Sequence, residues 1–106
     1  MEKDAFLAEV ASAPRVGGTD QTNIAHVVEK HIPPGTDLKN ALRFLGERGF
    51  KIFPYKGKNV PLGQEWFLAD KDESYRVILT ERTRVIIESD GNKVLNSRGW
   101  IFLMGL

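Results

Sequence analysis

The spacing of apolar residues changes near the middle of the chain, from the period of a helix to the period of a strand. Before residue 50, apolar side chains recur at i, i+3 and i+4, which predicts helices over 4–12, 24–31 and 38–45. After it, β-branched and aromatic residues gather in short segments, which predicts strands over 50–54, 64–69, 75–80, 83–89, 93–95 and 100–104. The connections are short, so the sheet is expected to be an antiparallel meander.

The segment between the second and third helices predicts a tight helical hairpin. Two prolines at 33–34 end the second helix, because each ring removes a backbone donor and restricts the residue before it. Thr36 is expected to cap the next helix. Gly49 should take the left-handed conformation just past its end, and Phe50 should then pack back onto Leu45. The cap of the second helix is expected at Thr19 or Asp20.

Together these elements predict an α+β fold in which the helical hairpin packs on one face of the sheet, with a short extra N-terminal helix. We expect residues 1–18, that helix and a Gly-rich linker, to be loosely attached to a single α+β domain over 19–106. Successive strand residues point to opposite faces, so Trp66 and Phe67 cannot both face the helices. Tyr75, Val77 and Leu79 are expected to face them. Some aromatic surface should therefore be exposed on the other face.

Composition excludes several classes of function. Fifteen Lys and Arg oppose fourteen Asp and Glu, and the net charge of +1 argues against nucleic-acid binding. No window of about 18 apolar residues predicts a transmembrane segment. The absence of cysteine excludes thiolate chemistry and zinc–thiolate sites. His26 and His31 lie about 140° apart around their helix and cannot share a metal. No metal or cofactor is predicted.

The usual patterns of catalytic residues are also missing. The four serines lack the GxSxG setting of a nucleophile, and Lys58 lacks the glycine pattern of a phosphate-binding loop. The acidic run 70–73 lacks the glycine and the downstream glutamate of a calcium loop, so it is expected to be a solvated turn. We therefore predict that the protein is not an enzyme.

The leading prediction is a protein-binding module that uses the open face of the sheet and the loop 56–63. Exposed aromatic side chains are favoured anchors in interfaces, and the candidates are Phe53, Tyr55, Trp66 and Trp100. Three alternatives stay open. Loops or the leading helix would instead cover these rings, or a homodimer would use the open face or the edge strand. A small cytosolic domain would instead bind an anion or ligand through Arg43, Arg48, Lys51, Lys56 and Lys58.

The segment Pro34–Gly46 resembles the helix-opening motif of bacterial cell-envelope proteins with the β-lactamase-inhibitor-protein fold, a group that includes outer-membrane lipoproteins of the SmpA/OmlA type. The similarity rests on Gly35, Thr36, Leu42, Leu45 and Gly46. The order of two helices and then an antiparallel meander is similar as well. The resemblance implies a noncatalytic adaptor, assembly factor or inhibitor that binds an unknown protein. It favours the periplasm or outer membrane if a signal segment has been removed, and the cytoplasm otherwise.

Overall fold

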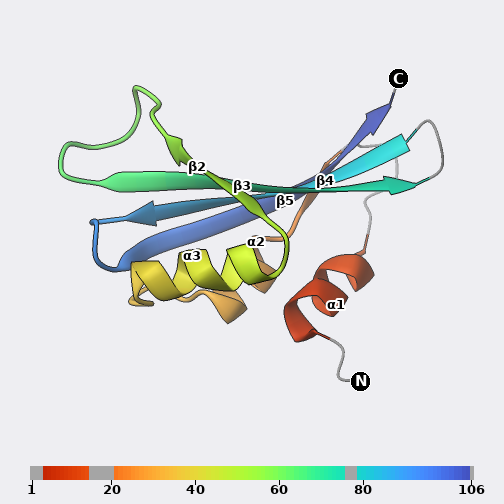
Figure 1. The fold of residues 1–106 in the computed structure, drawn as a ribbon, viewed down its shortest axis with the longest axis horizontal. Helices are drawn as coiled ribbons and strands as arrows, with labels where there is room; N and C mark the ends of the chain where they lie inside the picture. Colours follow the sequence, from red (N-terminus) through yellow and green to blue (C-terminus); the bar gives the residue numbers. More distant parts are fainter. Residues whose placement is uncertain (1–3, 15–20, 76–78, 106) are drawn as a thin grey trace.

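The computed structural model describes residues 4–14, 21–75 and 79–105, and in them it shows three helices and a five-stranded antiparallel sheet (Figure 1). The helices lie together on one side of the strands, which confirms the predicted α+β fold. The elements are α1 (Ala5–Ser12), β1 (Gln21–Asn23), α2 (Ala25–His31), α3 (Leu38–Glu47), β2 (Lys51–Tyr55), β3 (Glu65–Tyr75), β4 (Leu79–Ser89) and β5 (Val94–Gly105).

The strand order is β1-β5-β4-β3-β2, so β2 to β5 form the predicted meander and β1 adds an edge that the sequence pattern missed. β1 pairs through Thr22 with Ile101 of β5. The long strands are longer than predicted. Tyr75 and Leu79 are antiparallel partners, so the strand expected over 75–80 is wrong, and 70–74 belongs to β3 rather than to a turn. Residues 76–78, including the predicted helix-facing Val77, lie outside the described residues, as do the side chains of Tyr75 and Leu79.

The helical hairpin ends as the sequence predicts. Gly49 follows α3 with a φ of +90°, in the left-handed region. The Phe50 N–H donates to the Leu45 carbonyl at 3.1 Å, and the Gly49 N–H donates to the Gly46 carbonyl at 3.1 Å. These are the two hydrogen bonds of a Schellman closure. Phe50 is buried, so the turn directs the chain from α3 into the sheet.

The helix caps differ from the prediction. Asp37, not Thr36, caps α3, because its carboxylate accepts from the Asn40 N–H at 3.3 Å. The Thr36 hydroxyl instead donates to the Pro33 carbonyl at 2.6 Å. Thr19 and Asp20, the caps predicted for α2, lie outside the described residues. Asn23 accepts from the Ala25 N–H at 2.8 Å at the start of that helix.

The core lies between the sheet and all three helices, and α1 is part of it rather than loosely attached. The Phe6 ring meets the rings of His31 and Phe44 edge-on, with centroids 5.4 and 5.3 Å apart. The predicted domain boundary at residue 18 lies outside the described residues. The most buried large side chains are Phe6, Ile24, Val28, Ile32, Leu45, Val85, Ile87, Val94 and Ile101.

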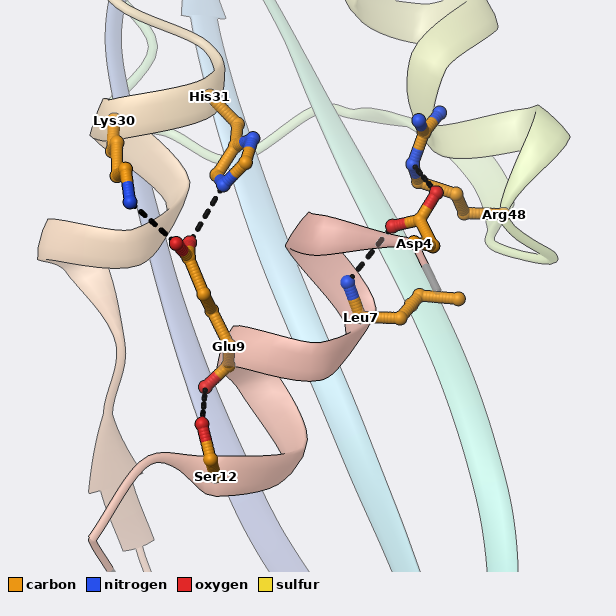
Figure 2. Close-up of polar contacts among 7 residues, drawn as sticks. All are labelled: Asp4, Leu7, Glu9, Ser12, Lys30, His31 and Arg48. Atoms are coloured by element: carbon orange, nitrogen blue, oxygen red, sulfur yellow. Dashed lines mark hydrogen bonds and ion pairs between the residues drawn. The ribbon is translucent and has the colours of Figure 1, made fainter. Parts of the chain in front are cut away.

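Polar contacts hold both ends of α1 against the hairpin (Figure 2). At its start, Arg48 Nε lies 2.8 Å from Asp4 Oδ2. Near its end, Glu9 pairs with Lys30, and its other carboxylate oxygen lies 2.6 Å from His31 Nε2. α1 is thus joined to α2 and to the end of α3 by charge as well as by apolar contact.

These contacts predict that acid weakens the docking of α1. The Leu7 N–H and then Arg48 lower the pKa of Asp4 from its ordinary 3.8, and hydrogen bonds from Lys30 and His31 lower the pKa of Glu9 from 4.5. A carboxylate whose pKa is lower in the folded state contributes stability above its unfolded pKa and loses it as the pH falls through the folded pKa. We therefore expect stability to fall between about pH 5 and about pH 3.

The measurement is urea unfolding at a series of pH values. A chain carrying Asp4→Asn and Glu9→Gln should lose less stability over this range than the unaltered chain. Some dependence should remain, because the pKa values of Asp72 and Asp90 are also lowered. Equal slopes in the two chains would show that α1 does not depend on these carboxylates.

Candidate interaction face

The register of the strands determines which side chains point away from the helices. Val85 and Ile87 of β4 are fully buried beneath the helices, so the residues between and beside them point to the opposite side. We name this side the open face. Along β2 it consists of the odd residues 51–55, and along β3, β4 and β5 of the even residues 66–72, 82–88 and 96–102.

All four predicted anchors lie on the open face, but they differ in exposure. Phe53 is 49% exposed, whereas Trp66 is only 8% exposed. The Tyr55 ring stacks on Trp66 with centroids 5.8 Å apart, and Trp66 Nε1 donates to Gln64 Oε1 at 2.9 Å. Phe67 packs against the core, as the alternation predicts. Trp66 therefore supports Tyr55 more than it contacts solvent.

An apolar row crosses the middle of the face from strand to strand. Phe53 pairs with Leu68, which pairs with Ile86, which pairs with Arg98. The two aliphatic side chains are half-buried by their neighbours. The row thus presents a strip of hydrocarbon that begins at Phe53 and ends at a cation.

Arg98 is fixed between two indole rings. Its guanidinium carbon lies 5.7 Å from the ring centroids of both Trp66 and Trp100, within the range of a cation–π contact. A terminal nitrogen lies 3.0 Å from Glu88 Oε2. The side chain keeps 37% of its surface exposed, so its ion pair with Glu88 lies at the surface, at the end of the apolar row.

Beside the apolar row lies an arginine–aspartate ladder formed by Asp70, Asp72, Arg82 and Arg84. Arg84 donates to both oxygens of Asp70 at 2.8 and 3.0 Å. Arg82 donates to both oxygens of Asp72 at 2.7 and 3.0 Å. The hydrogen bond from Arg82 lowers the pKa of Asp72, so this carboxylate is charged at neutral pH. Each bidentate pair fixes both side chains in one geometry.

The basic residues of the alternative prediction do not share a site. Arg48 pairs with Asp4 and stacks over the Phe44 ring at 3.6 Å. Arg43 is exposed on α3. Lys51 and Lys56 are separated by the length of β2, about 16 Å at the rise of a strand. Lys58 lies further along the loop.

Two hollows border the face. One of about 520 Å³ lies at the start of β2, between Lys51, Phe53 and Lys71. The other, of about 330 Å³, lies beside the loop and is lined in part by Tyr55 and Trp66. In the part of the chain that the structure describes, no three His, Cys, Asp or Glu side chains gather as metal ligands. None of the described helices is long and apolar enough to cross a membrane.

The chain matches no family model, no curated protein and no solved structure. The resemblance to bacterial envelope proteins therefore stays a prediction. What supports a function is the geometry of the open face.

Proposed function

We propose that this protein is a noncatalytic module that binds another protein molecule through its open face. The observation that carries the proposal is the uncovered row of Phe53, Leu68 and Ile86, which no described helix covers. Burying such hydrocarbon against a partner removes it from water, and this is the main source of affinity in interfaces.

The face is suited to binding because its side chains are already ordered. Trp66 is held by Tyr55 and Gln64, and Arg98 is held by two rings and Glu88. A surface that is fixed beforehand loses little side-chain entropy when a partner docks. The partner should offer an apolar strip beside charges of both signs, because the ladder next to the row carries both.

The setting we propose is that of an adaptor, assembly factor or inhibitor of the bacterial envelope. It is supported by the resemblance of residues 34–46 and by the order of helices and strands. The alternative, an anion-binding cytosolic domain, has less support because its five basic residues are dispersed over α3, its C-cap, β2 and the loop.

Phe53→Ala should weaken partner binding by about 2 kcal/mol or more, as expected for an interface anchor. It should change the stability little, because the ring is half exposed on an edge strand. The measurement is quantitative affinity capture from an extract of the source cells, followed by calorimetry with the captured protein.

The matched control is Leu103→Ala, which removes an exposed apolar side chain of β5 that lies on the opposite face from the row. Binding should survive this change. If Phe53→Ala retains its partners as well as Leu103→Ala does, and also shows no loss of self-association, the open face is not the contact surface.

A further inference from the structure

The charges of the open face are arranged so that the face complements itself. Arg82 and Arg84 form a positive column on β4, and Asp70 and Asp72 form a negative column on the adjacent β3. Neighbouring strands are about 4.8 Å apart, so the columns lie side by side. A two-fold axis above the face, parallel to the strands and midway between β3 and β4, would place each column over the opposite column of a second copy.

The same rotation matches the apolar row. It places β3 of one copy over β4 of the other with no shift along the strands, so residues that are register partners within one chain face each other between chains. Leu68 then meets Ile86, and Asp70 meets Arg84. A two-fold axis perpendicular to the strands would instead place β4 over β4 and set arginine over arginine. Only the axis parallel to the strands matches both the apolar and the charged residues.

The outer strands agree with this arrangement. β2 comes over β5, so Phe53 faces Arg98 and Lys51 faces Trp100, because each pair belongs to one row of the register. Each of these pairs joins a cation to an aromatic ring, which is a favourable contact. Four strands thus contribute to one self-complementary pattern.

We propose that the partner is a second copy of this chain, docked face to face about this axis as an isologous dimer. The inference rests on the proposed function, because it names the partner of the same surface. Four strands and the eleven residues of β4 give each copy a buried face of at most about 700 Å², just below the roughly 800 Å² per partner of standard interfaces.

The division of roles within the dimer follows from physical chemistry. The ladder is already neutralised within each chain, so it adds little affinity and instead selects the register. The apolar row supplies the affinity. Pro54 lies on the edge strand β2 and has no N–H to offer to another strand. Association by the face is therefore favoured over association by that edge.

The test uses charge reversal and sedimentation equilibrium. Asp70→Arg places arginine over arginine in the dimer, and Arg84→Asp places aspartate over aspartate. Each variant alone should therefore self-associate at least about tenfold more weakly than the unaltered chain, because like charges facing each other across an interface are strongly unfavourable. An equal mixture of the two should recover the dimer, since each copy then meets its opposite.

A chain with both exchanges, Asp70→Arg and Arg84→Asp, serves as the folded control because its internal ion pair is kept. It should dimerise with itself as the unaltered chain does, yet fail to pair with the unaltered chain. Circular dichroism and thermal unfolding establish that each variant is folded.

A monomeric unaltered chain, single variants that dimerise normally, or a mixture that stays monomeric would overturn the dimer. The proposed function would survive that result if Phe53→Ala still abolished capture of a different protein. It would fail with the dimer if Phe53→Ala changed neither capture nor self-association.

Discussion

Replacing Phe6 with alanine is expected to lower the free energy of unfolding by about 3–5 kcal/mol. The side chain is 1% exposed, and its ring lies between those of His31, Phe44 and Phe50 with centroids 5.3 to 6.1 Å away. Truncation would leave a cavity where α1 meets the hairpin. Alanine favours a helix, so the loss would come from packing and not from the helix itself. Urea unfolding measures the change.

The matched comparison is Phe53→Ala, the same chemical change on the open face. Because Phe53 is 49% exposed, its truncation should alter stability by well under half as much. Equal costs at the two positions would show that α1 is not part of the cooperative core.

Alanine in place of Gly99 is expected to cost about 3 kcal/mol, the upper end of the range for an overpacked site. An added Cβ would lie 2.7 Å from Val28 Cγ2 and 3.1 Å from Ile24 Cγ1. Both side chains are fully buried, and their β-branching leaves them few alternative rotamers. Gly99 also accepts a hydrogen bond from the Ile24 N–H at 2.9 Å. α2 can therefore pack this closely against β5 only because residue 99 is a glycine.

Gly46→Ala provides the matched control. Gly46 lies in α3, and the nearest atom to an added Cβ is Ile52 Cδ1 at 4.0 Å. The change should raise stability by about 0.5–1 kcal/mol, because alanine loses less backbone entropy than glycine in a helix. A cost at Gly99 no different from that at Gly46 would contradict the tight contact.

The helical hairpin could be predicted because its signals are local. The prolines at 33–34 and the left-handed Gly49 act within a few residues of themselves, and the predicted Phe50 contact follows from the same turn. The sequence predicts the N-cap of α3 one residue too early, because Thr36 and Asp37 are both good caps and only the hydrogen bonds distinguish them.

The bounds of the strands are harder to predict from sequence, because their polar residues have partners that are far away in the chain. The acids of 70–73 resemble a solvated turn, but Asp70 and Asp72 are neutralised by Arg84 and Arg82 on the next strand. β1 has only three residues, all of them polar, so only its pairing with β5 reveals it.

The candidate site could likewise be predicted only in part from the sequence. Aromatic content and alternation predicted the anchors, and all four lie on one face. Neither pattern indicated the position of Arg98 between Trp66 and Trp100, or the match of Leu68 with Ile86, because both follow from the register of strands. Gly99 was missed because a close contact leaves no mark in the sequence beyond one small residue.

The pairing of β1 with β5 has a consequence for biosynthesis. Thr22 and Ile101 are about 80 positions apart, and a ribosome adds about 5–20 residues per second, so roughly 4–16 s separate the two strands. During that interval the apolar sides of the helices have no completed sheet to cover them. The nascent chain is therefore exposed to aggregation until β5 emerges.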